Sequence, residues 1–127
     1  MEDITKAEIF PDPIRQLPEA ALPLRGVRAY LSQADTHQIL FMQFGEDDDM
    51  PEHAHAAQMG IVLEGRIDLV IDGEKRTYLK GDRYYIPGGA RHSGKVYAGF
   101  AQVAFFNEPE RYRPIARGAV NHTFKEA

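Results

Sequence analysis

Three of the five histidines in this chain of 127 residues are spaced as ligands of a metal ion would be. His53 and His55 are separated by one residue, and side chains two residues apart in a strand point to the same face. Gln58 follows closely, and His92 lies far along the chain, after the turn sequence at residues 87–89 (PGG). A local pair with a distant third ligand is an arrangement that a folded β-barrel can gather around one divalent cation.

The same residues also have a simpler interpretation. A His-x-His pair after an acidic segment can be a solvent-exposed loop feature, and a lone histidine such as His92 is commonly held in a loop by hydrogen bonds. His37 and His122 fit no ligand spacing, and we expect them to be surface or packing residues. The elements around the histidines therefore decide between the two interpretations.

Short β-type runs separated by turn residues dominate the chain after Leu24. Asp72 and Gly73 favour a type I′ hairpin, because both residues tolerate positive φ. The acidic segment 46–49 is predicted to be a solvated loop, and Gly99 a bulge or close-approach point in the longest run. The predicted strands are residues 26–31, 38–44, 59–63, 66–71, 74–79, 83–86 and 95–106. Their number and spacing predict an all-β fold, a jelly roll or a similar closed barrel.

The two ends of the chain differ from this pattern. Residues 1–23 contain four prolines, and because proline lacks a backbone donor, we expect an extended, irregular arm that lies along the barrel or exchanges with a partner subunit. Residues 19–22 could form one turn of helix within it. The predicted organisation is an N-terminal arm (1–23), a barrel (24–113) and a C-terminal tail (114–127).

Composition and charge exclude several classes of function. The net charge is −4 and no stretch concentrates Lys and Arg, so nucleic acid is not an expected partner. No apolar stretch approaches the roughly 20 residues of a membrane span, and the start of the chain lacks the apolar region of a secretory signal. The absence of cysteine removes disulfides and thiolate ligands. We expect a cytoplasmic protein with no membrane partner.

Two segments resemble the two motifs of the cupin family. Residues 45–65 have a glycine, a His-x-His pair, a polar residue in place of the usual acidic one, six further residues and a glycine. Residues 81–96 have the spacing glycine, five residues, proline, one residue, glycine, two residues and histidine. The resemblance implies a double-stranded β-helix, a jelly-roll barrel. It also implies that one divalent metal is held near the mouth by His53, His55, Gln58 and His92.

The chain departs from the cupin pattern at two positions. Gln58 stands where the family usually has Glu, and Val96 where it usually has Asn. Glutamine is a neutral oxygen donor, so the metal would keep its full positive charge, act as a stronger Lewis acid and favour an anionic chelating ligand. Alternatively, Gln58 only donates a hydrogen bond near the centre. The residues suit zinc, nickel, iron and manganese, and they do not identify the metal.

Some cupins that linearise unsaturated uronates also have Gln at this position, and the continuation at residues 60–65 is similar. The chain differs from them in having only two residues between His55 and Gln58, and in lacking an Asp on the last predicted strand. This resemblance suggests a sugar-acid-like substrate but names no catalytic carboxylate.

Three polar side chains on β-type runs are candidates for contact with a small-molecule ligand: Gln43, Tyr97 and Gln102. The two amides could instead bond neighbouring strands, and the tyrosine could serve in packing.

We predict a metal-dependent enzyme that acts on a small oxygenated molecule by isomerisation, ring opening or elimination. The alternatives are a non-catalytic binding or sensing module and an iron-dependent dioxygenase. Because cupins commonly pair their barrels, a homodimer is expected.

Overall fold

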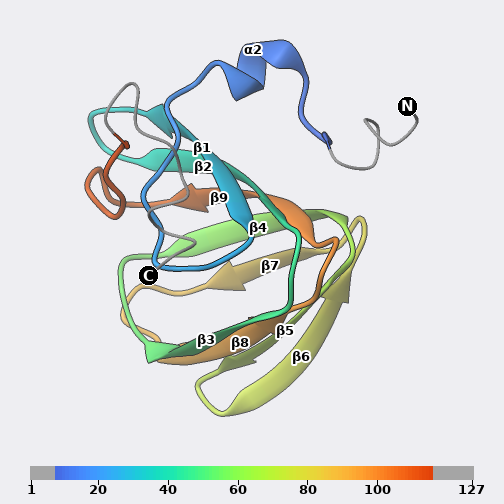
Figure 1. Cartoon of the computed structure of the whole chain (residues 1–127). Helices are drawn as coiled ribbons and strands as arrows, with labels where there is room; N and C mark the ends of the chain where they lie inside the picture. The colour runs from blue at the N-terminus through green and yellow to red at the C-terminus, as the bar shows by residue number, and fades with distance from the viewer. Residues whose placement is uncertain (1–7, 116–127) are drawn as a thin grey trace.

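The chain folds into two antiparallel sheets that face each other (Figure 1). The computed structural model describes residues 8–115. One sheet has the strand order β1-β2-β9-β4-β7 and the other β3-β8-β5-β6. The strands are β1 (Val27–Gln33), β2 (Gln38–Phe44), β3 (Asp48–His53), β4 (Gln58–Glu64), β5 (Arg66–Ile71), β6 (Glu74–Leu79), β7 (Arg83–Ile86), β8 (His92–Val96) and β9 (Ala101–Phe106). The predicted all-β class and jelly-roll barrel are confirmed.

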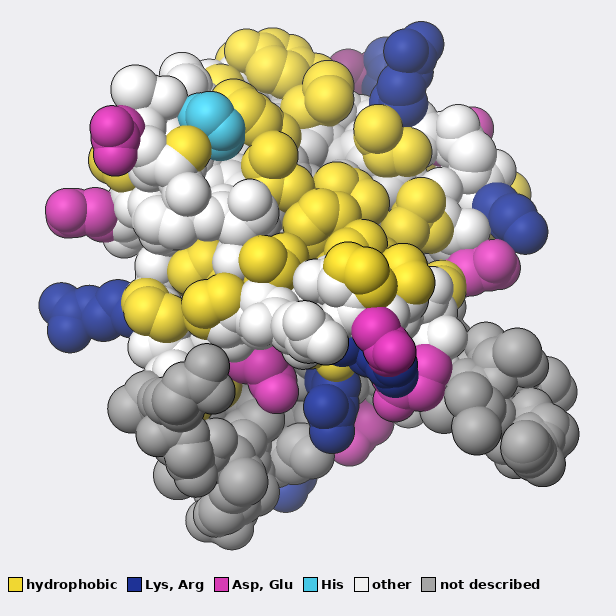
Figure 2. All heavy atoms as spheres, turned by 90° about the horizontal axis from the view of Figure 1, so that it is seen from above, with side chains coloured by type: hydrophobic (Ala, Val, Ile, Leu, Met, Phe, Trp, Pro, Cys, Tyr) yellow, Lys and Arg dark blue, Asp and Glu magenta, His cyan; other side chains and the backbone are white. Residues whose placement is uncertain are grey.

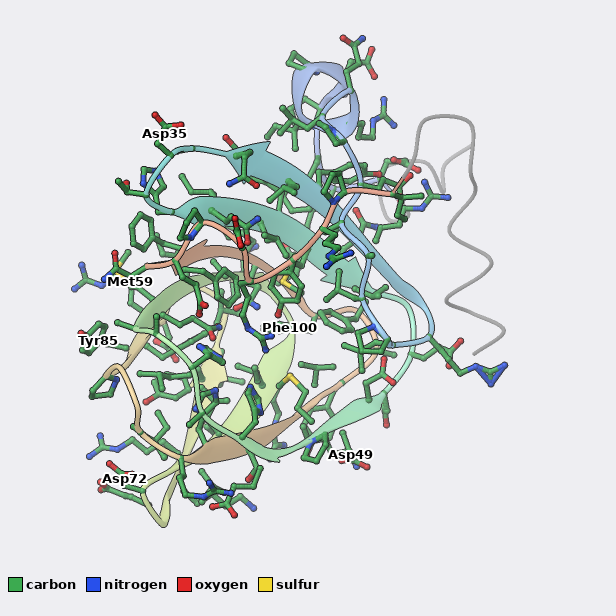
Figure 3. All side chains as sticks on the ribbon, turned by 90° about the vertical axis from the view of Figure 1, so that its left-hand side faces the viewer. Asp35, Asp49, Met59, Asp72, Tyr85 and Phe100 are labelled. Atoms are coloured by element: carbon green, nitrogen blue, oxygen red, sulfur yellow. The ribbon has the colours of Figure 1, made fainter. Side chains whose placement is uncertain are left out.

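Alternating side chains build the core between the sheets. Along β2, Leu40, Met42 and Phe44 are buried while the residues between them are half-exposed, as the two-residue period of a strand requires. β9 lies between β2 and β4 and pairs with both. Phe100, just before β9, is fully buried and lies between the two sheets (Figure 3). The interior therefore draws its side chains from both sheets.

Residues with positive φ close turns between the strands, including the hairpin that the sequence predicted. Asp72 and Gly73 have φ values of 49° and 83°, as a type I′ hairpin between β5 and β6 requires. Gly65 has φ 77° at the junction of β4 and β5, where an added Cβ would lie 2.7 Å from the Phe100 Cα atom. That position needs glycine both for its backbone angle and for the close approach.

Two sequence predictions about strands were wrong. The run predicted at 95–106 is not continuous, because Gly99 turns the chain at φ 93° and separates β8 from β9. The acidic segment 46–49 is not wholly a loop, because β3 begins at Asp48, which pairs with Val96 of β8. Pairing with a neighbouring strand outweighs the low strand propensity of aspartate.

The described part of the N-terminal arm lies along its own barrel. It contains a short helix, α2 (Asp12–Arg15), in which a proline occupies the first turn. Residues 19–22 form no helix, contrary to the prediction, because Glu19 forms a β-bridge with Tyr30 and Ala20 one with Pro114. The arm thereby covers the edge strand β1. Within residues 8–115, no helix is long and apolar enough to cross a membrane.

Candidate metal centre

His53 and His92 meet because two strands pair in register. His53 ends β3, His92 begins β8, and the two lie directly opposite each other in the antiparallel pair. His55 follows in the connection to β4, where the Ala56 N–H donates to Glu108 Oε2 at 3.1 Å and anchors the loop. Backbone pairing therefore positions two of the rings, and an anchored loop positions the third.

The distances among the three histidines suit a shared metal ion. One possible ligand nitrogen from each lies within 4.8 Å of the others, and His55 Nε2 is 3.2 Å from His92 Nε2. With metal–nitrogen bonds of about 2.0–2.1 Å in a tetrahedral site, two ligand nitrogens lie roughly 3.3 Å apart. The observed separation is close to this value.

The other ring nitrogen of each histidine lies against a backbone carbonyl. The distances are 2.8 Å from His53 Nδ1 to the Pro51 oxygen, 2.7 Å from His55 Nδ1 to the Ala56 oxygen, and 2.9 Å from His92 Nδ1 to the Ala90 oxygen. A carbonyl oxygen only accepts, so each Nδ1 carries a proton, and a ring in the neutral form then presents the lone pair of its Nε2. Lone pairs of His55 and His92 that face each other at 3.2 Å repel, and a cation between them removes that repulsion.

Two of the imidazoles are held in the neutral form that a metal requires. Burial lowers the pKa of His55 and the pKa of His92 below the ordinary value for histidine. The positive charge of Arg111 lowers both pKa values further, and the carbonyl bonds oppose this shift only in part. The rings therefore do not have to lose a proton before they bind a metal at neutral pH.

Gln58 lies at the start of β4 and takes part in a chain of hydrogen bonds. Its Nε2 donates to the Tyr84 hydroxyl at 2.9 Å, and that hydroxyl donates to Gln102 Oε1 at 2.6 Å. Gln102 Nε2 in turn contacts Met42 Sδ at 3.4 Å. Burial raises the pKa of Tyr84, so the hydroxyl keeps the proton that it donates.

Met42 fixes the direction of this chain. A thioether sulfur accepts hydrogen bonds and donates none, so the group of Gln102 that faces it is the NH₂ group. Gln102 then presents its oxygen to Tyr84, and Gln58 presents its NH₂ group to the hydroxyl oxygen. The amide oxygen of Gln58 is thereby directed away from Tyr84 and left for another partner. The position of Gln58 as a fourth ligand stays a prediction, with which this orientation is compatible.

The centre lies in a cavity of about 350 Å³ between the sheets. The three histidines, Gln58 and Gln102 all line it. Most of the remaining wall is apolar and includes Met42, Phe44, Ile67, Leu69, Ile86 and Phe106. A cavity of this size holds small organic ligands. The arrangement therefore leaves space beside the histidines, unlike a structural site closed by four protein ligands.

The structure does not bring Gln43 and Tyr97 to this cavity, although both were predicted to contact a ligand. Met42 and Phe44 line the cavity, so the alternation of β2 turns Gln43 to the outer face, where its Oε1 lies 3.4 Å from the Ile9 nitrogen. The Tyr97 hydroxyl donates to Asp68 at 2.7 Å on the outer side of β5. Composition shows that a run is a strand, but it does not show which face a polar residue takes.

Among the wall residues with polar side chains, three were not predicted as parts of the site: Tyr84, Arg111 and Tyr112. Tyr84 lies opposite Gly60 in the β4–β7 pair. A glycine inside a strand often marks a place where another group comes close to the backbone, so Gly60 could have indicated this contact from the sequence. The other two follow the last strand, where contacts far apart in sequence position them. No local pattern shows such contacts.

Comparison with known proteins supports the cupin resemblance over the middle of the chain. A family model described as a cupin domain matches residues 39–97, which include both motifs. Quercetin 2,3-dioxygenase of Bacillus subtilis (strain 168) is 38% identical over 67 residues, which cover 51% of this chain and 20% of that protein. The chain thus spans about a fifth of the length of this curated relative.

Two solved structures share the fold at lower identity. An RmlC-like cupin from Shewanella frigidimarina NCIMB 400 is 21% identical, with a TM-score of 0.65, over 76% of this chain and 87% of that one. KdgF from Halomonas sp. is 21% identical, with a TM-score of 0.59, over 68% and 81%. The fold and the site define a class of protein: a jelly-roll barrel with a cluster of three histidines in its cavity. Residues 39–97 match the cupin domain model, and the described chain has the jelly-roll fold of solved cupin structures.

Proposed function

We propose that this protein is a metal-dependent enzyme that acts on a small oxygenated molecule. The observation that most directly supports the proposal is the convergence of His53, His55 and His92 in a cavity of about 350 Å³. Room for a ligand beside the metal is typical of catalytic rather than structural centres. Gln58 completes the proposed ligand set through its amide oxygen.

A divalent metal held by these residues would supply a Lewis acid that polarises a carbonyl or hydroxyl oxygen. Three neutral imidazoles and a neutral amide leave the charge of such a metal uncompensated, which favours a ligand with an anionic oxygen. Tyr84 and Gln102 hold the amide of Gln58 in one orientation. The apolar walls lower the local dielectric constant, which strengthens the attraction between opposite charges at the centre.

Two particular observations favour other functions. No Asp, Glu or Lys within residues 8–115 lines the cavity, so a reaction that needs a carboxylate base has no evident candidate, and this favours a non-catalytic binding module. The likeness to quercetin 2,3-dioxygenase over 67 residues supports a dioxygenase instead. Imidazole ligands suit iron as well as zinc, nickel and manganese, so the identity of the metal bears on this choice.

Elemental analysis of the purified protein tests the centre. The wild type should contain about one divalent metal per chain, and loading with metal should raise its melting temperature, because a ligand that binds only the folded state stabilises it. The double variant His53→Ala, His92→Ala should lose both effects. His37→Ala is the matched control, because the His37 ring stacks on Phe105 with centroids 4.9 Å apart and does not line the cavity.

A wild-type protein that contains no metal and cannot be loaded would contradict the proposal. For the loaded protein, oxygen consumption with aromatic hydroxy compounds would indicate the dioxygenase. Oxygen-independent conversion of hydroxy acids or sugar acids would indicate Lewis-acid chemistry. Ligand binding without turnover in both assays would favour the binding module.

A further inference from the structure

The cavity wall includes one positively charged side chain, Arg111, and no carboxylate among the described residues. Arg111 lines the same cavity as His55 and His92. Within the described residues, its Nε atom is buried and has no hydrogen-bond partner. A guanidinium group is a strong donor that is normally paired when its nitrogens are removed from water. This one has donor capacity to spare at a site that holds a small molecule.

The arginine is held in place by its neighbour in sequence. The Arg111 guanidinium lies over the Tyr112 ring at 4.8 Å. The fully buried Gln38 fixes Tyr112 from both sides, since its Nε2 donates to the Tyr112 carbonyl at 2.8 Å and its Oε1 accepts from the Tyr112 N–H at 3.0 Å. The Tyr112 ring also packs edge-on against Phe106, with centroids 5.3 Å apart. Such fixed geometry reduces the entropy lost when the guanidinium binds a ligand.

Among residues 8–115, the nearby acidic groups do not already neutralise Arg111. Glu108 is the nearest carboxylate in sequence to face the centre, but its Oε2 accepts from the Ala56 N–H at 3.1 Å and lies 3.9 Å from His55 Nδ1. Neither Glu108 nor Glu110 lines the cavity. Among residues 8–115, the wall therefore contains one guanidinium group and no carboxylate, and an anion is the complementary ligand.

The rest of the cavity restricts what carries that anion. Its walls are methionine, phenylalanine, leucine and isoleucine side chains, and the amides of Gln58 and Gln102 are partly committed to Tyr84. Several hydroxyl groups of a sugar would be buried there without partners, at a cost for each of about 1–3 kcal/mol. An apolar ring would instead gain from burial.

We propose that Arg111 binds the carboxylate of a ligand whose remaining body is an apolar ring. The proposal rests on the proposed function for the assumption that this cavity is the ligand site, and it narrows the substrate class from oxygenated molecules in general to apolar carboxylates. The planar guanidinium can donate two parallel hydrogen bonds to the two carboxylate oxygens.

Three probes separate charge from shape. Calorimetric titration would use 2-naphthoate as the apolar carboxylate, 2-naphthamide as its neutral analogue and D-galacturonate as a polar carboxylate. Each would be titrated into chelator-treated protein and into zinc-loaded protein. The wild type should bind naphthoate about tenfold or more tightly than either of the others in both forms, because a charge-assisted bidentate contact is lost with the amide and apolar burial is lost with the sugar acid.

The variants Arg111→Met and Arg111→Lys carry the test. Arg111→Met should lose the preference for naphthoate over naphthamide, and Arg111→Lys should keep part of it, because the charge remains without the planar fork. Arg113→Met is the matched control, since Arg113 lies on the same segment, is exposed and does not line the cavity. An unchanged melting temperature would show that each variant is folded. If Arg111→Met does not fold, the preference of Arg111→Lys for naphthoate over naphthamide becomes the test, and a preference as large as that of the wild type would contradict the proposal.

Two outcomes would overturn the inference: a naphthoate preference that survives in Arg111→Met, or galacturonate binding as tight as that of naphthoate. Failure of naphthoate to bind either form of the wild type would overturn it as well. Because the preference is measured in the chelator-treated protein too, absence of a metal from the wild type would contradict the proposed function without deciding the role of Arg111.

Discussion

The direction of one amide decides whether an oxygen atom or an NH₂ group of Gln58 is available to the three imidazoles. That direction is set three side chains away, at Met42, and is transmitted through Gln102 and Tyr84. A metal ligand without charge depends on such support more than a carboxylate does, because an amide presents a useful donor atom on only one side. The hydroxyl of Tyr84 is the member of the chain that can be removed with least change in shape.

We expect Tyr84→Phe to weaken metal binding by about tenfold, since loss of a group that orients a ligand typically costs this much. The free energy of unfolding should also fall by about 1–3 kcal/mol, because the amides of Gln58 and Gln102 lose a partner in a buried place. Competition with a chromophoric chelator and urea denaturation measure the two effects. Tyr85→Phe is the control, because Tyr85 is 60% exposed on the outer face. Equal metal affinities of wild type and Tyr84→Phe would show that the hydroxyl does not orient Gln58.

A second buried polar group lies on the other side of the barrel wall. Asp68 accepts hydrogen bonds from Arg66 at 3.1 Å, Thr77 at 2.7 Å and Tyr97 at 2.7 Å. Burial alone would raise the pKa of its carboxyl, but these three bonds together hold that pKa well below its ordinary value. The group therefore has a role in stability that the metal centre does not share.

The pH dependence follows from the sign of this shift. A carboxyl with a lower pKa in the folded state adds stability above its unfolded pKa of about 3.9 and loses it as the pH falls further. We expect Asp68→Asn to lower the free energy of unfolding by about 1–3 kcal/mol at neutral pH, and the gap from the wild type to narrow below about pH 4. Urea denaturation at several pH values measures it, with exposed Asp35→Asn as the control. A gap that stays constant down to pH 2 would contradict the role of ionisation.

The sequence placed the three histidines together correctly, but it assigned Gln43 and Tyr97 to a cavity that they do not line. His53 and His55 are two residues apart, and that spacing has a consequence for direction in any extended chain. Gln43 and Tyr97 were selected by type alone, and nothing in their runs shows which side of the sheet they face. Arg111 is placed by the bond between Gln38 and the Tyr112 backbone, a contact between segments far apart in the chain.

Close contact between β4 and β7 makes the centre possible at the level of elements. Gly60 lies opposite Tyr84 in this pair, and a Cβ at Gly60 would overlap the Tyr84 ring. The missing side chain is what lets the ring lie over β4 and place its hydroxyl between Gln58 and Gln102. A glycine in one strand thus determines the position of a tyrosine in the next.

We expect Gly60→Ala to displace the Tyr84 ring, lower the free energy of unfolding by about 1–3 kcal/mol and weaken metal binding together with it. Urea denaturation and chelator competition measure both on the same samples. Gly45→Ala is the control, because a Cβ there would meet its nearest atom, the Gly26 carbonyl oxygen, at an ordinary 3.6 Å. If Gly60→Ala kept wild-type stability, the ring would have room to move and the packing argument would be wrong.

Strands with regular alternation and clear turns could be predicted to the residue, as β2, β5, β6 and β7 show. The division between β8 and β9 could not, because the residues on both sides of Gly99 are equally β-type and only its φ of 93° separates them. The acidic start of β3 was missed because its pairing with β8 supplies the strand, and propensity does not.

At the scale of the whole molecule, the outer face of the larger sheet is unusually apolar. Ile39, Phe105, Met59 and Tyr85 are successive partners across β2, β9, β4 and β7 and form one row, and Phe41, Val103 and Ile61 form the next. Met59 is 41% exposed, Ile61 36% and Tyr85 60%. Met59 and Tyr85 point outward from the sheet (Figure 3), and hydrophobic side chains gather in a broad band on the upper side of the molecule (Figure 2). Apolar patches of this kind mark interaction sites.

We expect this face to be the contact of the predicted homodimer, because the same apolar patch on two copies can pair across a two-fold axis. Light scattering after gel filtration should give about twice the chain mass of 14.3 kDa for the wild type. The double variant Met59→Lys, Ile61→Lys should be monomeric, since it places two like charges from each copy against the other. Leu79→Lys is the control, because Leu79 is 52% exposed on β6 of the smaller sheet. A monomeric wild type at all concentrations, or a double variant that stays dimeric, would show that this face serves another purpose.

Retained metal binding in the monomeric variant would show further that each barrel completes its own centre, as the position of all proposed ligands within one chain requires.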